Sequence, residues 1–223
     1  MSAAPGPQDT RIDSAYAWAR VFASLAIMGV GFAGLYSIVV ALKPVAADLG
    51  ATRGGVSLAY AVLFTGFGFG GIIMGWWSDR IGTMWPVLAG SVSIAAGLLL
   101  AAQATSLWQV VLAFGLLVGF LGMSAIMVPL VANITHWFDR RRGIATSIVI
   151  SGSYLAGTIW PPLLQIGIEE IGWRETWTRV GIGCFLVMAP LSLLLRRRMV
   201  LPSTSGQDGR RRRRALGFTP TSM

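Results

Sequence analysis

Charge is scarce in this sequence. Asp, Glu, Lys and Arg together make up 12% of the 223 residues, whereas 54% of the residues are hydrophobic. A soluble domain carries about 25% charged residues, which cover its surface. So few charges leave too little polar surface for a soluble globule, so lipid must cover much of the chain. The composition therefore indicates an integral membrane protein.

Cysteine and histidine are almost absent, with one residue of each, Cys184 and His136. One cysteine excludes an intrachain disulfide, and the sequence has no cluster with metal-ligand spacing, so we expect no metal and no cofactor. Ionisable residues are also missing from the depth of the apolar runs, except for Arg20 near the end of one run. We expect its side chain to extend toward the headgroups. Without a paired acid and base at one depth, we expect the chain not to be an enzyme.

Six long apolar runs divide the chain. A membrane-spanning helix needs roughly 20 mostly apolar residues, and these runs are apolar on all faces, unlike the short alternating strands of a β-barrel. The sequence therefore predicts an all-α membrane protein with a bundle over residues 18–195, between a polar segment, 1–17, and a basic polar tail, 196–223. The predicted spans are Trp18–Leu42, Gly54–Trp77, Trp85–Gln103, Leu107–Ile134, Gly143–Gly167 and Thr176–Leu195.

Basic residues are distributed unevenly between the two sides of these spans. The side that holds both termini carries 14 of the 18 Lys and Arg residues, and eight of the 14 lie in the C-terminal runs Arg196–Arg198 and Arg210–Arg214. Because basic residues stay cytoplasmic, both termini are expected in the cytoplasm. The first arginine run directly follows an apolar segment, so lipid headgroups explain it better than nucleic acid does. Eight of the nine tryptophans lie near predicted span ends, where we expect them at headgroup level.

The connection between the second and third runs reads Gly75-Trp76-Trp77-Ser78-Asp79-Arg80-Ile81-Gly82. This pattern resembles the loop between the second and third helices of major facilitator superfamily (MFS) transporters. The resemblance implies roles for Gly75, Asp79, Arg80 and Gly82, and in the family the aspartate contacts a helix of the other half and helps to hold one conformation. The physical logic agrees, since a carboxylate can accept from helix N-terminal N–H groups and glycine permits a tight turn. A generic cytoplasmic turn is the alternative, and Thr83 and Met84 replace the basic residues usual in the family.

A second motif precedes the fifth run. Its residues Trp137, Phe138, Arg141, Arg142 and Gly143 resemble the same turn in bacterial monocarboxylate-porter-type MFS proteins. Gly172-Trp173-Arg174 and Trp160-Pro161-Pro162 also fit that subfamily. The arginines alone are equally explained as a topology signal. Together the resemblances imply the N-terminal half of an MFS fold, built from two inverted three-helix repeats, with residues 196–223 resembling the linker between halves.

Few polar residues are available to contact a solute. The cavity candidates are Tyr36, Asn133, Ser151, Tyr154, Trp160 and Gln165, and each has packing as its alternative role. Pro129 and the Pro161-Pro162 pair are expected to interrupt the fourth and fifth spans, as cavity-facing breaks or as static kinks. Small-residue pairs, such as Gly66/Gly70 and Gly115/Gly119, predict close helix packing.

The resemblance implies transmembrane transport of a small organic solute, with a monocarboxylate as one option. The expected partners are the lipid bilayer, the solute, and either a C-terminal six-helix half or a second copy; no nucleic acid is expected. The expected location is a bacterial cytoplasmic (inner) membrane. The alternative is a non-transporting membrane protein, either a truncated form or an assembly partner.

Overall fold

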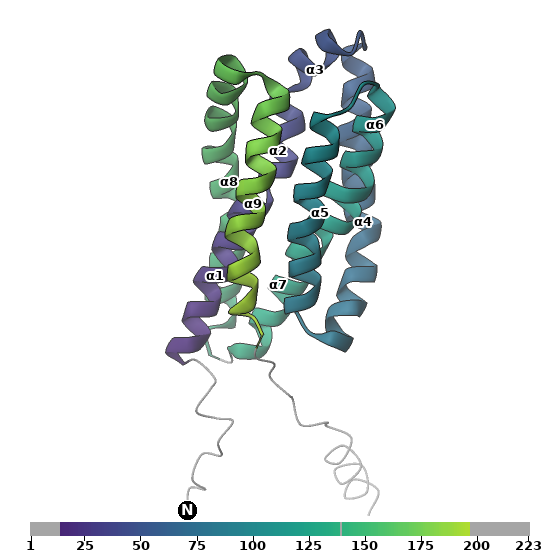
Figure 1. The fold of residues 1–223 in the computed structure, drawn as a ribbon. Helices are drawn as coiled ribbons and strands as arrows, with labels where there is room; N and C mark the ends of the chain where they lie inside the picture. The colour runs from purple at the N-terminus through teal and green to yellow at the C-terminus, as the bar shows by residue number, and fades with distance from the viewer. Residues whose placement is uncertain (1–13, 139, 197–223) are drawn as a thin grey trace, which may run out of the picture.

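The computed structural model describes residues 14–138 and 140–196. The terminal segment 1–13 and the predicted linker-like residues from 197 onward lie outside the described residues. Every regular element in the described part is a helix (Figure 1). The elements are α1 (Ala15–Gly31), α2 (Ala33–Val40), α3 (Leu42–Asp48), α4 (Arg53–Ile81), α5 (Met84–Ala102), α6 (Leu107–Leu112), the π-helix η2 (Ala113–Met123), α7 (Ser124–Trp137), α8 (Arg142–Ile171) and α9 (Trp173–Leu193).

These elements form six candidate membrane spans, which confirms the predicted all-α fold. The spans cover Ala15–Val40, Gly54–Ile81, Met84–Ala102, Leu107–Thr135, Arg142–Ile171 and Trp173–Leu193. The start of α1 and the end of α9 lie at the same end of the bundle (Figure 1), where the Tyr16 hydroxyl donates to the Leu194 carbonyl at 2.9 Å. We call this the terminal end. The end that carries α3 is the opposite end.

Spans 2 and 5 run four residues further than the sequence predicted. They end at Gly82 and Gly172, whose φ angles of 90° and 82° favour glycine and stop a right-handed helix. Each glycine N–H still bonds to the carbonyl four residues earlier, at 2.8 Å and 3.1 Å. Asp79 and Arg80 therefore lie in the last turn of α4, and the prediction that they occupy an open polar turn was wrong.

The prolines do not break their helices. Pro129 lies inside α7, and Pro161 and Pro162 lie inside α8, so the alternative of a helix break was wrong, and the alternative of static kinks stays a prediction. A membrane helix tolerates the loss of a proline N–H where neighbouring groups adjust to the freed carbonyl. The irregular backbone lies elsewhere, in the break of span 1 at Phe32 and in the π-helical middle of span 4.

Two helix crossings fit the predicted pair of inverted three-span units. A Cβ on Gly29 of span 1 would stand 3.4 Å from the Gly152 carbonyl oxygen of span 5, and a Cβ on Gly119 of span 4 would collide with the Leu63 backbone of span 2. Gly29 and Gly119 are 90 residues apart, as are the two turn glycines. Spans 1 and 4 start from opposite ends, so the symmetry that exchanges them inverts the bundle.

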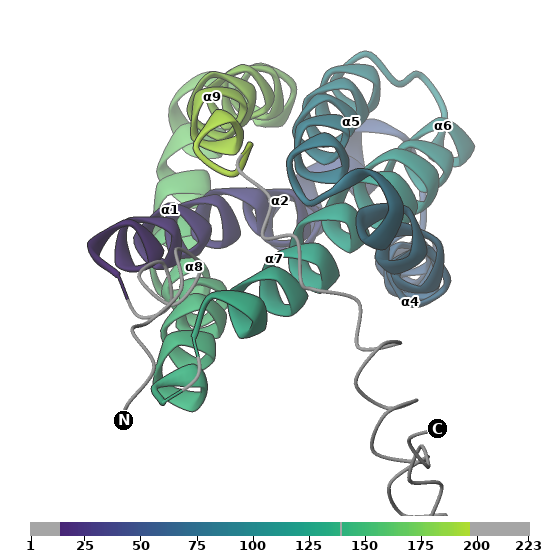
Figure 2. The ribbon, with the colours of Figure 1, turned by 90° about the horizontal axis from the view of Figure 1, so that it is seen from below.

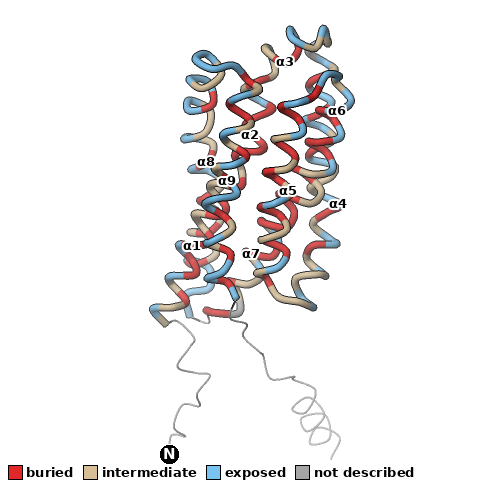
Figure 3. The backbone as a smooth tube through the Cα atoms, viewed as in Figure 1, coloured by how far each residue is buried: buried red, intermediate tan, exposed pale blue. Residues whose placement is uncertain are grey.

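Each unit crosses over to pack against the other, so the six spans form one interlocked body. Viewed along the bundle, α8 and α9 lie on one side and α4 and α5 on the other, with α2 and α7 between them, and α1 begins on the side of α8 and α9 (Figure 2). The predicted small-residue packing is confirmed where span 2 meets span 4, because a Cβ on Gly66 would collide with the Gly115 carbonyl. Buried residues line the spans along this interior (Figure 3).

Candidate functional site

The first motif ends α4 at the terminal end. Arg80 stacks over Trp76, with 4.0 Å between the guanidinium carbon and the ring centroid. Asp79 is exposed, and no hydrogen bond or ion pair joins its carboxylate to another described side chain. Gly75 lies against span 4, where a Cβ added to it would stand 3.4 Å from a methyl carbon of Val128. The motif therefore presents its carboxylate outward from this bundle, and its contact with a second half stays a prediction.

The second motif anchors the turn between α7 and α8. Trp137 and Phe138 are almost fully buried and pack edge-on against Tyr16 and Trp18, with ring centroids 5.6 Å and 5.2 Å apart. The Arg142 Nε donates to the Phe138 carbonyl at 3.2 Å. The Trp137 ring is thus part of the core that joins this turn to span 1, and its depth relative to the headgroups stays a prediction.

The other two residues of this motif lie outside that core. Arg141 is the N-cap of α8, and Gly143 lies in the first turn of that helix, and both are exposed.

Arg20 is the residue whose surroundings the sequence predicted least well. Its side chain is 1% exposed and does not extend to the headgroups. Nη2 donates to Asn133 Oδ1 at 2.6 Å, and the guanidinium stacks on Trp137 at 4.5 Å and reaches the Leu194 and Leu195 carbonyls at 3.4 Å and 3.5 Å. One arginine thus joins spans 1, 4 and 6. The asparagine at the end of an apolar run was the signal that could have indicated this partner.

The six cavity candidates do not converge on one point. Asn133 holds Arg20, and the Trp160 indole donates to the Gly29 carbonyl at 2.8 Å, which ties span 5 to span 1. Tyr36 lies against Gly157 on the same contact between spans 1 and 5. The remaining three lie on α8. The Ser151 hydroxyl donates to Ile148, Gln165 donates to Glu169, and Tyr154 is 75% exposed. Their role toward a solute stays a prediction.

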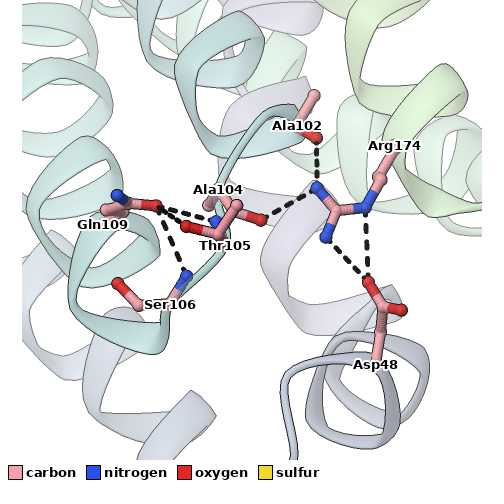
Figure 4. A network of polar contacts seen from close by, with 7 residues as sticks. All are labelled: Asp48, Ala102, Ala104, Thr105, Ser106, Gln109 and Arg174. Atoms are coloured by element: carbon pink, nitrogen blue, oxygen red, sulfur yellow. Dashed lines mark hydrogen bonds and ion pairs between the residues drawn. The ribbon is translucent and has the colours of Figure 1, made fainter.

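A second arginine organises the opposite end (Figure 4). Arg174 at the start of α9 makes an ion pair with Asp48 of α3 at 2.8 Å, and its Nη1 donates to the Ala102 and Ala104 carbonyls at 2.9 Å and 2.8 Å. The neighbouring loop is fixed by Gln109, whose Oε1 accepts from the Thr105 N–H at 2.7 Å. Arg174 thus joins the connections that follow spans 1, 3 and 5.

The description of the protein family whose model matches this chain is Major Facilitator Superfamily, and the match covers residues 17–220. The chain belongs to this superfamily. The six-span inverted-repeat bundle agrees with that membership. The peptide transporter POT in complex with sulfate shares this fold, with a TM-score of 0.65 at 18% identity over 94% of this chain and 46% of that one.

Relatives of this MFS chain include named transporters. The chain is 32% identical over 136 residues to MFS-type transporter pynF of Aspergillus niger. This alignment covers 61% of this chain and 31% of that protein. It is 27% identical over 211 residues to human monocarboxylate transporter 11. This alignment covers 93% of this chain and 43% of that protein. The match spans less than half the length of either relative.

Proposed function

We propose that this chain is the N-terminal six-helix half of a secondary transporter for a small organic solute, with a monocarboxylate as the first candidate. The supporting observation is the interlocked six-span bundle of inverted units, because alternating access uses two such bundles that rock about a central site. The name of the human relative supports the choice of solute. This relative aligns with 93% of the chain, so its name supports a monocarboxylate as the first candidate.

The distribution of burial also supports a second half as partner. In the most apolar stretch of spans 2 and 5, 22% of the residues are buried within the described chain, against 67% in span 4. Large apolar side chains such as Ile72 of α4 and Tyr154 of α8 are 74% and 75% exposed. These two helices therefore have surface available for lipid and for a second bundle.

Transport assays distinguish half of a transporter from a chain that transports on its own. The purified chain, reconstituted in liposomes, is expected to show no saturable uptake of lactate or pyruvate, because one bundle cannot alternate access. Co-expression with a six-helix C-terminal half is expected to restore uptake. Saturable uptake by the chain alone would contradict the half-transporter proposal and favour a working homodimer. No uptake with any second half would favour a non-transporting membrane protein.

We further propose that the terminal end faces the cytoplasm. Arg80 and Arg140 to Arg142 lie at this end, whereas Lys43, Arg174 and Arg179 lie at the opposite one, and basic residues favour the cytoplasmic side. In a Cys184→Ala background, single cysteines at Ala51 and Ile171 are expected to react with an impermeant thiol reagent from outside intact cells. Cysteines at Arg140 and Arg141, which are exposed at the terminal end, are expected to stay unlabelled. The reverse pattern would overturn this orientation.

The bacterial subfamily and the bacterial inner membrane remain predictions. They rest on the likeness of the Trp137–Gly143 turn to bacterial monocarboxylate-porter-type proteins. The relatives compared above come from a fungus and an animal. Expression in bacterial and in yeast membranes, with the yield of correctly inserted chain as the readout, tests which bilayer suits the bundle.

A further inference from the structure

We propose that a cavity at the opposite end of the bundle, between α3 and α8, is a capture site for a short organic acid that carries a hydroxyl or ammonium group beside its carboxylate. This inference rests on the proposed function for the role of such an acid as the transported solute. The binding itself is a property of the described chain.

The cavity has a volume of about 480 Å³ and lies where the end of span 1 faces the end of span 5. This volume is within the range of about 300–1,000 Å³ that is usual for ligand pockets. Val39 and Val40 from α2 and Ile168 from α8 form an apolar wall, and Lys43, Gln165 and Glu169 supply the polar groups. Apolar walls with a few polar groups are the usual composition of a small-molecule site.

Among the cationic side chains that the structure describes at this end, Lys43 is the one without an ion pair to a described carboxylate. Among the side chains that the structure describes there, Arg174 is paired with Asp48 at 2.8 Å and Arg179 with Glu175 at 2.9 Å. No ion pair joins Lys43 to a described acidic residue, although Glu169 lines the same cavity. The Lys43 ammonium is therefore available to a carboxylate that enters from solution.

The α8 wall offers hydrogen-bond acceptors. Gln165 Nε2 donates to Glu169 Oε1 at 2.6 Å, one turn further along the helix. This bond orients the carboxylate and leaves its second oxygen, together with the Gln165 carbonyl oxygen, to accept from a ligand. A plain anion would meet only repulsion at this wall, whereas a donor beside the carboxylate would be bound.

The two walls together select a class of solute. A ligand must place an anionic group at Lys43, a donor at Glu169 and a short apolar body against the valines, as a 2-hydroxy acid or an amino acid does. The cavity also lies at the outer end of the contact between spans 1 and 5, along which Tyr36 meets Gly157 and Trp160 meets Gly29. A solute captured there would lie at the entrance to that contact.

The test is equilibrium binding to the purified chain in nanodiscs, followed by saturation-transfer NMR with L-lactate, L-alanine and pyruvate. Lactate and alanine are expected to bind better than pyruvate, which has a carbonyl in place of the donor. Lys43→Gln is expected to weaken lactate binding about three- to fivefold, the effect of losing one exposed charge pair, whereas Lys43→Arg retains it. Arg179→Gln is the matched control, because this exposed cation lies at the same end and is paired with Glu175.

The Glu169→Gln variant tests the acceptors of the α8 wall separately from the Lys43 ammonium. It is expected to remove the preference for lactate over pyruvate, and to weaken alanine more than lactate because the ammonium loses its carboxylate. Whichever of lactate and alanine binds better identifies the natural donor, and both outcomes support the site. Equal binding of pyruvate and lactate to the unchanged chain would overturn the proposal. So would equal lactate binding by the Lys43→Gln and Arg179→Gln variants.

The binding result is independent of the transport result. Binding without uptake by the assembled transporter would contradict the proposed function and leave the site standing. Uptake that Lys43→Gln and Glu169→Gln leave unchanged, together with no saturable binding to the chain, would overturn the site alone.

Discussion

The turn that joins α4 to α5 and the turn that joins α8 to α9 have the same backbone and different surroundings. Each ends its helix with one glycine of φ near 85°, at opposite ends of the bundle. At the Gly172 turn, Arg174 binds a carboxylate and two carbonyls from neighbouring connections. At the Gly82 turn, Asp79 is exposed and has no described ion-pair partner. One turn is thus bound within its own bundle, and the other leaves its carboxylate exposed.

The arginines of the two ends differ in a related way. Arg20 is held by neutral acceptors, Asn133 and two carbonyls, inside an aromatic core, whereas the Arg174 side chain is 42% exposed and binds a carboxylate. A buried charge needs its full set of hydrogen bonds, while an exposed ion pair contributes little by itself. The terminal end should therefore lose more stability than the opposite end when its arginine is removed.

The largest effect is expected at the helix crossings. Gly119→Ala should destabilise the chain by about 2–3 kcal/mol, because the added methyl group collides with the backbone of span 2. Gly29→Ala, its counterpart in the other unit, should cost far less, because its Cβ would stand 3.4 Å from the nearest atom. Thermal unfolding in detergent measures both. Gly68→Ala, with nothing within 4 Å, is the control. Equal melting temperatures for the Gly119 and Gly68 variants would refute the close crossing.

The next effect is expected at Arg20. Arg20→Leu should cost about 2 kcal/mol, because Asn133 and the end of α9 lose a buried donor. Hydrogen exchange at residues 191–196 should also rise, since the last turn of α9 loses its link to span 1. Asn133→Leu in the same background should restore part of the loss by removing the orphaned amide. A double variant as unstable as the sum of the two single variants would contradict the pairing.

A smaller effect is expected at Arg174. Arg174→Gln should cost about 1 kcal/mol, because the ion pair with Asp48 is half exposed and solvent screens it. A double-mutant cycle with Asp48→Asn isolates the pair from the bonds to Ala102 and Ala104. Arg80→Gln is the comparison from the other turn and should cost less, about 0.5 kcal/mol, since it removes an exposed stack on Trp76. A larger loss at Arg80 than at Arg174 would reverse the contrast between the turns.

The smallest effect in the chain alone is expected at Asp79. Asp79→Asn should change stability by less than about 0.5 kcal/mol, as surface substitutions do. With a C-terminal half present, the cost should rise to about 1–2 kcal/mol if the carboxylate accepts from a helix N-terminus of that half. Melting temperatures of the chain with and without the second half measure the difference. An identical shift in both contexts would argue against any contact between halves.

Hydropathy was sufficient to predict the six spans, because a spanning helix must be apolar over a fixed length. It could not place the ends of α4 and α8, since Asp79 and Glu169 continue a helix as readily as they enter a turn. Only the positive φ at Gly82 and Gly172 ends these helices.

The surroundings of Arg20 and the π-helix were harder to predict from the sequence. The rule that arginine extends to the headgroups holds for an isolated helix, and it fails where spans 1, 4 and 6 meet around a core of Trp137 and Asn133. The π-helix over Ala113–Met123 consists of the same apolar and small residues as an α-helical span. No local pattern in the sequence distinguishes this stretch, which packs against spans 2 and 3.

The inverted symmetry also bears on how such a bundle originates. Two copies of one three-span unit can occupy opposite orientations in one membrane only if that unit inserts both ways. Such a unit would need almost no charge bias between its ends, since basic residues favour the cytoplasmic side. In a fold of two inverted units, the basic residues of the connections, such as Arg140 to Arg142 between spans 4 and 5, supply an asymmetry that the symmetric backbone lacks.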